Sequence, residues 1–302
     1  MKTFYSNGKL LITGEYVVLD GAKSLALPTK FGQYLHIEEG SNKEIYWKSF
    51  DSDGSIWFET KLFFSEISNN THQENQPIRN TLIEILHEAF LLNPDFLNKT
   101  EGYIVTTKLT FPRNWGLGTS STLINNIAQW LQIDAFTLLK NSFGGSGYDI
   151  ACAQNNNPIL YQLKNGNTIV TPISFEPEFT RNIYFVYLNQ KQNSKEGISA
   201  YRNKKADLSK IIPEIDSITN KIINADNLET FVNELNKHET IISQLLEIKT
   251  AKEMLFPDFN GTLKSLGAWG GDFVMAVSEE NPTTYFKEKG YETVLAYKDL
   301  IL

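Results

Sequence analysis

The chain has 302 residues, of which 41% are hydrophobic and 21% charged, so it can form two modest domains with a buried core. Its formal net charge is −7, and no dense stripe of lysine and arginine occurs, which argues against a nucleic acid as partner. The single cysteine, Cys152, excludes an internal disulfide and cannot form a structural zinc site alone. Its small apolar neighbours predict a buried side chain.

No apolar stretch approaches the length of a membrane span, and residues 1–9 lack the apolar segment and cleavage site of a signal peptide. We therefore expect a cytoplasmic protein without a membrane partner, as a monomer or a homodimer. The four histidines are scattered without the spacing of metal ligands and receive no role: His36, His72, His87 and His238.

The first half of the chain alternates predicted strands and helices. The elements are a strand at 10–14, a hairpin within 44–63, a helix at 77–92, a strand at 103–111, a helix at about 121–133 and a strand at 159–163. The hairpin has the strongest signal, because alternating apolar residues flank Asp53-Gly54.

The stretch 164–177 is polar, contains Gly166 and two prolines, and is our predicted boundary between domains at 1–168 and 169–302. The second half contains a strand at 182–188, helices at about 206–222 and 226–248, a strand at 272–278, a helix at about 283–289 and a strand at 292–296. This pattern predicts an α+β arrangement with helices packed against an antiparallel sheet.

A glycine-rich segment, residues 112–121, joins a predicted strand to an amphipathic helix. Gly116 and Gly118 let the backbone approach a ligand closely, and the start of the following helix favours an anion. The hydroxyls of three consecutive residues can cap the helix, bind phosphate oxygens or help hold a divalent metal: Thr119, Ser120 and Ser121. A tight turn with a helix cap is the simpler alternative, but this combination favours phosphate binding.

Two well-known sequence patterns of nucleotide-dependent enzymes are absent. Gly21-Ala22-Lys23-Ser24 lacks the upstream glycine of a Walker loop. Gly271-Asp272-Phe273 is not the Asp-Phe-Gly of protein kinases, and no His-Arg-Asp loop occurs.

Two charged residues suit phosphoryl transfer, which depends on positioning and charge neutralisation. Lys9 precedes an apolar strand, so its amine can emerge at a strand end in a cleft. Asp149 follows the glycine cluster 144–147 and can cap a helix or orient the proton of an attacking hydroxyl. Lys9 beside Asp149 would keep the carboxylate ionised.

Three separated segments resemble the three motifs of the GHMP kinases (galactokinase, homoserine kinase, mevalonate kinase and phosphomevalonate kinase). Residues 7–19 resemble the first motif, especially its form in mevalonate and phosphomevalonate kinases, 112–121 the second and 266–272 the third. Gly147-Tyr148-Asp149-Ile150-Ala151 also resembles the hallmark of a subgroup named GYDIA. The order and approximate spacing of these motifs agree over nearly the whole chain.

The resemblance implies an α+β two-domain GHMP kinase fold, with an N-terminal domain like ribosomal protein S5 domain 2, a C-terminal ferredoxin-like domain, and ATP between them. It implies that Asp149 is the catalytic aspartate, that Lys9 assists it, and that Ser120 binds Mg²⁺. The residues it implies for nucleotide binding are Pro112, Gly116, Leu117, Gly118, Thr119, Ser120, Ser121, Gly270 and Gly271.

The chain departs from the family pattern in two places. Many relatives supply a glutamate for Mg²⁺ between the phosphate loop and the aspartate, but residues 119–148 contain none. Asp134 is the only carboxylate there, and it suits the start of a helix. Trp269 stands where a glycine is usual, which predicts a stiffer and bulkier third loop.

The first motif also bears on the acceptor. Glu15-Tyr16 is not followed by the Asp-Tyr pair of the sugar kinases, which disfavours galactokinase-like activity. The form of the first motif and the Gly-Gly-Asp of the third favour mevalonate or phosphomevalonate. A phosphorylated acceptor needs further cations, for which Lys191 and Lys195 are candidates, although both suit a solvated loop.

Two alternatives stay open at this point. An ATP-dependent diphosphomevalonate decarboxylase is the closest rival, and the Gly8-Lys9 motif counts against it. A non-catalytic, nucleotide-binding regulatory protein is the other, because the usual glutamate is missing.

Overall fold

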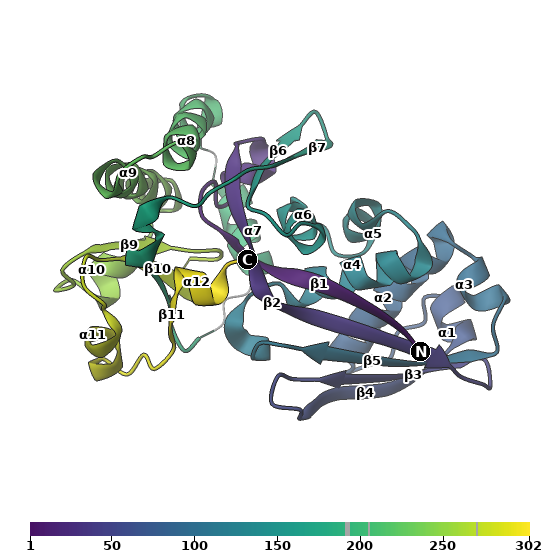
Figure 1. The fold of residues 1–302 in the computed structure, drawn as a ribbon. Coiled ribbons are helices and arrows are strands. Elements are labelled where there is room, and N and C mark those ends of the chain that lie inside the picture. The colour runs from purple at the N-terminus through teal and green to yellow at the C-terminus, as the bar shows by residue number, and fades with distance from the viewer. Residues whose placement is uncertain (191–193, 205, 270) are drawn as a thin grey trace. The chain divides into compact units, whose positions relative to one another are not determined.

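The computed structural model describes residues 1–190, 194–204, 206–269 and 271–302 (Figure 1). Among these residues, no helix is both long and apolar enough to cross a membrane. The chain forms two compact units. The first unit comprises Met1–Gly8, Phe31–Arg113 and Leu117–Gln154, and the second comprises Lys9–Lys30, Asn114–Gly116 and Asn155–Leu302.

This grouping differs from the single boundary predicted between residues 168 and 169. Strands β1 (Lys2–Leu11) and β2 (Ser24–Glu39) each contribute residues to both units, so residues 9–30 group with the C-terminal part. The polar stretch 164–177 is not a plain linker, because it contains strand β7 (Asn167–Pro172), which pairs antiparallel with β6 (Ile159–Lys164). Gly166 supplies the left-handed backbone of their turn, with φ of +78°.

The first unit is built on strands in the order β4-β3-β5-β2. These are the C-terminal part of β2 with β3 (Glu44–Phe50), β4 (Ile56–Phe63) and β5 (Gly102–Leu109). Strand β3 runs parallel to β5, and the other two pairs are antiparallel. The predicted hairpin is confirmed as β3–β4, and Gly54 adopts φ of +85° in its turn.

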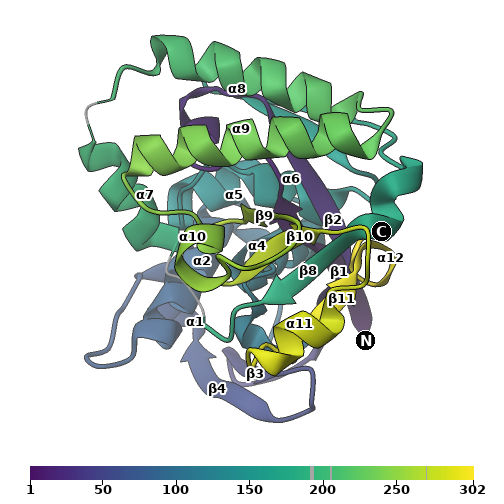
Figure 2. The ribbon, with the colours of Figure 1, turned by 90° about the vertical axis from the view of Figure 1, so that its left-hand side faces the viewer.

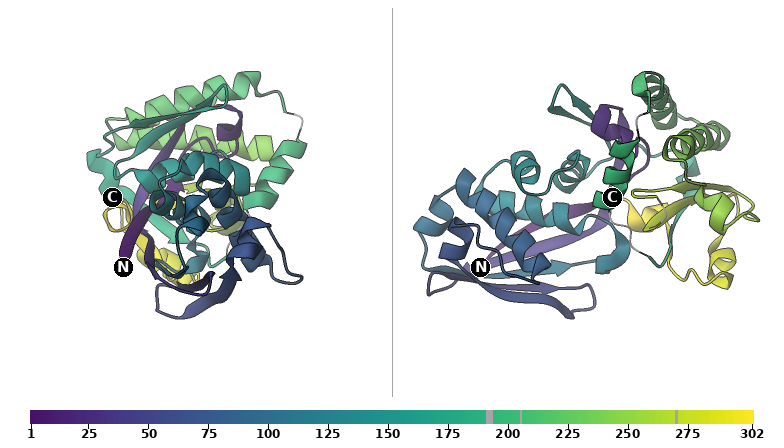
Figure 3. Two further views of the ribbon diagram at one scale, coloured as in Figure 1. Left: turned by 90° about the vertical axis from the view of Figure 1, so that its right-hand side faces the viewer. Right: turned by 180° about the vertical axis from the view of Figure 1, so that it is seen from behind.

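The helices of the first unit are α1 (Phe64–Ser68), α2 (Pro77–Leu92), α3 (Asp95–Asn98), α4 (Thr119–Leu131), α5 (Ala135–Ser142) and α6 (Tyr148–Gln154). Helices α2, α4 and α5 lie on one face of the sheet (Figures 1 and 3). The core there contains the buried side chains of Leu35, Trp47, Leu82, Val105, Ile124 and Leu138. The predicted helix start at Asp134 is confirmed, since its carboxylate accepts the Thr137 N–H at the start of α5.

In the second unit, a short 3₁₀ helix, η1 (Val17–Asp20), follows β1, and the start of β2 pairs with β6. A four-stranded antiparallel sheet has the order β11-β8-β10-β9. Its strands are β8 (Ile183–Tyr187), β9 (Thr262–Ser265), β10 (Phe273–Val277) and β11 (Val294–Ala296). All five residues of β10 are buried, and β10 lies between β8 and β9 in the sheet.

The helices that accompany this sheet are η3 (Glu178–Asn182), α7 (Ser194–Asn203), α8 (Leu208–Ile223), α9 (Leu228–Leu246), α10 (Ala251–Leu255), α11 (Thr283–Glu288) and α12 (Tyr297–Leu300). Helices α8 and α9 run side by side (Figure 2), and α9 also packs against β9. Phe256 and Phe286, at the end of α10 and in α11, pack against Val186 and Val274 in a second core. The predicted antiparallel sheet with packed helices is confirmed. A turn of 3₁₀ helix at Arg113–Trp115 (η2) completes the elements that the structure describes.

Candidate active site

Lys9 and Gly116, 107 positions apart in the chain, meet in the second unit. The Lys9 ammonium donates to the Gly116 carbonyl oxygen at 3.0 Å in a partly buried position. The residues before Gly116 are anchored on the four-stranded sheet. The Trp115 ring meets Phe273 edge-on with centroids 5.5 Å apart, and the Tyr187 hydroxyl donates to the Asn114 carbonyl at 3.2 Å.

Asp272, the last residue of the third glycine-rich segment, lies against the same glycine. A Cβ atom added to Gly116 would lie 2.3 Å from the Asp272 Cγ and 2.5 and 2.6 Å from its two carboxylate oxygens. Gly116 also adopts φ of +68°, where a side chain is strained. The Asp272 carboxylate therefore occupies the space that any larger residue at position 116 would need.

The remainder of the phosphate-loop segment begins α4 in the first unit. Gly118 is the N-cap residue with φ of +97°, and no side chain caps the first turn of α4. The Ser121 hydroxyl donates to the Gly118 carbonyl at 2.9 Å and is buried, while Thr119 and Ser120 are partly exposed. The helix start thus presents amide groups and two accessible hydroxyls, an arrangement that favours an anion.

Two other predicted nucleotide-binding residues precede this helix start in the sequence. Leu117 is fully buried, so its side chain does not reach solvent. Pro112 is exposed and follows β5 by a short turn. Of the third segment, Gly271 is buried, whereas Gly270 lies outside the described residues. Lys191 and the Lys195 side chain also lie outside them.

Asp149 lies in the first turn of α6, after a turn in which Gly144, Gly145 and Gly147 all have positive φ. Its carboxylate accepts the N–H of the next residue, Ile150, at 3.1 Å. Helix α6 packs against α4, and the Gln154 amide donates to the Asn125 side chain at 3.0 Å. The helix that carries Asp149 is therefore fixed to the helix that begins at the phosphate loop.

A buried ionic cluster links the first motif to β9 and α9 in the second unit. The Lys264 ammonium pairs with the Glu15 carboxylate, contacts Glu239 at 3.4 Å and donates to the Ser265 carbonyl at 2.6 Å. The Glu15 side chain is 1% exposed and that of Lys264 0%. Burial raises the pKa of Glu15 to about 7, although the Lys264 charge opposes the shift.

His238 belongs to the same cluster and was given no role from the sequence. Its Nε2 accepts the Gly14 N–H at 2.8 Å, which requires the neutral ring. Burial and the neighbouring Lys264 charge hold the pKa of His238 well below its ordinary value, in agreement with that hydrogen bond. His238 therefore fixes the backbone of the first motif as a neutral acceptor.

Trp269, the unusual residue of the third segment, is 6% exposed and packs in an apolar cluster with Val17, Tyr201 and Ile242. Its backbone N–H donates to the Tyr16 hydroxyl at 3.2 Å. Tyr16 has φ of +66°, which is rare for a bulky residue. The tryptophan is thus a packed side chain that ties the third segment to the first motif.

The described residues contain no group of three or more histidine, cysteine, aspartate or glutamate side chains that could hold a metal. Mg²⁺ does not need such a group, because it commonly binds one or two carboxylates together with substrate phosphates and water. Cys152 is buried, which confirms the prediction for its side chain.

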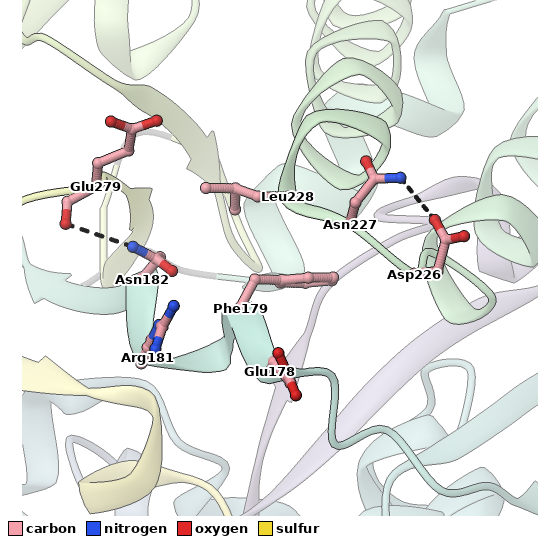
Figure 4. A pocket seen from close by; sticks show the side chains of 8 residues that line it. All are labelled: Glu178, Phe179, Arg181, Asn182, Asp226, Asn227, Leu228 and Glu279. Carbon is pink, nitrogen blue, oxygen red and sulfur yellow. Dashed lines mark hydrogen bonds between the residues drawn. The ribbon is translucent and has the colours of Figure 1, made fainter.

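A pocket of about 560 Å³ in the second unit lies among η3, the start of α9 and Glu279 (Figure 4). Its lining includes Glu178, Arg181 and Asp226, so charges of both signs face it. The Asn182 amide reaches the Glu279 carbonyl at 3.5 Å along its rim. None of the site residues predicted from the sequence lines this pocket.

No protein-family model and no curated protein matches the sequence, but solved structures match nearly the whole chain. A mevalonate kinase is 20% identical with a TM-score of 0.69, over 97% of both chains. Streptococcus pneumoniae phosphomevalonate kinase, in complex with phosphomevalonate and AMPPNP, is 16% identical with a TM-score of 0.69, over 96% of both chains. The chain has the GHMP kinase fold.

The match extends beyond these two kinases. A D-glycero-D-manno-heptose 1-phosphate kinase from Bacteroides thetaiotaomicron is 17% identical with a TM-score of 0.63, over 99% of this chain and 95% of the other. The GHMP kinase fold predicted from the three motifs is therefore confirmed over the whole chain. The sequence did not reveal the buried partners of Glu15. Lys264 lies 249 positions away in the chain, and no recognisable motif surrounds it in the sequence.

Proposed function

We propose that the protein is an ATP-dependent small-molecule kinase that acts in the cytoplasm as a monomer or homodimer. The main support for this proposal is that Lys9 and Asp272 both lie against Gly116 in the second unit. Each residue comes from a different one of the three segments that resemble GHMP motifs. A structural turn alone would not require a lysine and an aspartate at the same glycine.

In this proposal the start of α4 binds the ATP phosphates through its amide groups and through the hydroxyls of Thr119 and Ser120. Lys9 is held by the Gly116 carbonyl and supplies positive charge for the transferred phosphoryl group. Asp149 orients the acceptor hydroxyl and takes its proton as the phosphoryl group transfers. Mg²⁺, bound through Ser120, would neutralise phosphate charge.

We favour mevalonate or phosphomevalonate as the acceptor. The form of the first motif supports this choice, as does the Gly-Gly-Asp sequence that ends at Asp272. Proteins named for these two substrates are among the matching structures, although galactokinase and heptose kinase structures match as well.

The test is ADP release from the purified protein with Mg²⁺ and ATP, with mevalonate, phosphomevalonate and diphosphomevalonate offered separately. Turnover with one of the first two supports the proposal. Carbon dioxide released together with ADP from diphosphomevalonate would identify a decarboxylase instead. ATP binding without turnover with any acceptor would contradict the choice of acceptor, and lack of ATP binding would contradict the kinase assignment.

A further inference from the structure

Strand β4 is a terminal strand of the sheet in the first unit (Figure 1). Among the strands that the structure describes, β4 pairs with β3 alone. Ile56 and Phe63, at the two ends of β4, are 49% and 51% exposed. The backbone N–H and C=O groups along such an edge can pair with a strand of another chain. The outer edge of β4 is therefore a candidate surface for a partner strand.

The backbone of β4 determines which of its groups point to that edge. The Phe64 N–H, directly after β4, donates to the Lys43 carbonyl at 2.9 Å, directly before β3. In an antiparallel pair, the N–H and C=O of one residue point to the same side, and the side alternates along the strand. Residues 58, 60 and 62 therefore face β3, and the N–H and C=O groups of Trp57, Glu59 and Lys61 point to the outer edge.

The charged side chains of β4 lie on the face of the sheet that the helices of the first unit do not cover. Leu62 points to the helices and is buried in the core, so Glu59 and Lys61 point to the opposite face. The Glu59 carboxylate lies 3.3 Å from the Lys48 ammonium, and the Lys61 ammonium lies 3.3 Å from the Glu44 carboxylate. β4 thus carries one negative and one positive charge, two residues apart.

We infer that β4 pairs antiparallel with the same strand of a second copy of this chain, around a two-fold axis at Thr60. In this register Glu59 lies opposite the partner's Lys61, and Trp57 lies opposite the partner's Phe63. The two-fold axis makes each contact twice. The opposite charges attract each other across the strands, and the exposed Phe63 ring gains an aromatic neighbour.

Charge and backbone geometry select this register over its neighbours. A shift by two residues places Glu59 opposite the partner's Glu59, or Lys61 opposite the partner's Lys61, and like charges directly opposite are destabilising. A shift by one residue places groups that point outward opposite groups that point to β3. The Phe63 N–H already donates to the Glu66 carboxylate at 2.9 Å, so the ladder of paired N–H groups ends there.

This inference concerns assembly and does not depend on the proposed activity. It goes beyond a choice between monomer and homodimer, because it assigns the surface and the register of the dimer. The alternative is that Glu59 and Lys61 serve only to pair with β3 of their own chain. Exchanging the two charges separates these roles, because the exchange restores attraction between copies but not the ion pairs with Lys48 and Glu44.

The experiment is sedimentation velocity of the full chain over a range of protein concentrations. The variants are Glu59→Lys, Lys61→Glu and the double variant. Each single variant places like charges opposite each other at both symmetric contacts and should weaken the dimer by about tenfold or more. The double variant should recover the dimer relative to either single variant. Lys108→Glu makes the same charge change on an exposed residue of β5 and should dimerise like the wild type.

A wild type that stays monomeric at every concentration would overturn the inference. A dimer that both single variants leave unchanged, or that the double variant does not recover, would also overturn it. The kinase proposal would stand in either case, since it is tested by turnover.

A disulfide at the two-fold axis provides a second measurement if the charge variants do not fold. Residues opposite each other without hydrogen bonds have Cα atoms about 4.5 Å apart, a distance that a disulfide can span. The native Cys152 is buried. Thr60→Cys should therefore give a covalent dimer on mild oxidation, and Thr171→Cys, on exposed strand β7, should not. Equal crosslinking of the two variants would contradict an axis at Thr60.

Discussion

The carboxylate of Glu15 and the ammonium of Lys264 form an ion pair inside the second unit, with both side chains almost completely removed from solvent. Glu239 completes the cluster by accepting both the Ser265 N–H and its hydroxyl. Such a cluster adds little net stability compared with apolar packing, but removing one partner leaves a buried charge unpaired. Because Glu15 belongs to the first motif, the ionic cluster holds that motif against β9 and α9.

Replacing Lys264 by methionine should destabilise the protein by about 3–5 kcal/mol, because two buried carboxylates lose their cation. Urea unfolding of the variant measures this change. The double variant Glu15→Gln/Lys264→Met should recover part of the loss, whereas Lys289→Met, which breaks a surface pair with Asp258, should stay close to the wild type. An unfolding midpoint for Lys264→Met equal to that of the wild type would rule out the ionic cluster.

Glu15 should also make stability depend on pH. The pKa of Glu15 is about 7 in the folded protein, against an ordinary value near 4.5. Between pH 4.5 and 7, therefore, the folded state keeps a proton that the unfolded state has lost. The contribution of Glu15 to the free energy of unfolding is therefore largest at low pH and decreases as the pH rises from about 4.5 to 7. The total decrease is on the order of 3 kcal/mol.

The measurement is the difference in unfolding free energy between the wild type and Glu15→Gln across this pH range. The difference isolates the effect of Glu15, because the titration of His238 changes stability with pH in the opposite direction. Its lowered pKa removes stability as pH falls below its ordinary value of 6.5. A difference between wild type and Glu15→Gln that does not change with pH would contradict the shifted pKa of Glu15.

Much of the fold could be predicted because its signals are local. The hairpin at Gly54 follows from an Asp-Gly turn between alternating strands, and α2 was predicted at its observed bounds from apolar spacing alone. Strand β2 was missed, because its first six residues are all buried and show no alternation. The cluster around Glu15 was missed for a different reason, since Glu239 and Lys264 become its neighbours only when the chain folds.

Asp149→Asn should lower kcat by about a hundredfold or more and leave AMPPNP affinity nearly unchanged, because the proposed role of Asp149 concerns the acceptor hydroxyl and not the nucleotide. Steady-state kinetics together with calorimetry measure both quantities. Asp134→Asn is the matched control, since Asp134 caps α5 in the same unit and carries no proposed catalytic role. Turnover of Asp149→Asn at the wild-type rate would exclude Asp149 as the catalytic residue.

Gly116→Ala should reduce AMPPNP affinity by about tenfold or more, because the new Cβ would meet the Asp272 carboxylate and force the loop to move. Gly166→Ala is a close control. Gly166 has a similar φ of +78°, but nothing lies within 4 Å of its added Cβ. That variant should lose only about 1 kcal/mol of stability from backbone strain and keep its nucleotide affinity. Equal affinity in both variants would show that the contact between Gly116 and Asp272 does not shape the site.

We propose that this protein transfers the γ-phosphoryl group of ATP to mevalonate or phosphomevalonate. The most direct test follows the reaction by ³¹P NMR, with Mg²⁺, ATP and each acceptor in turn. We predict that ADP appears together with an equal amount of a new phosphorylated acceptor, and that Asp149→Asn slows both signals alike. Appearance of ADP with inorganic phosphate and no phosphorylated acceptor would contradict the claim.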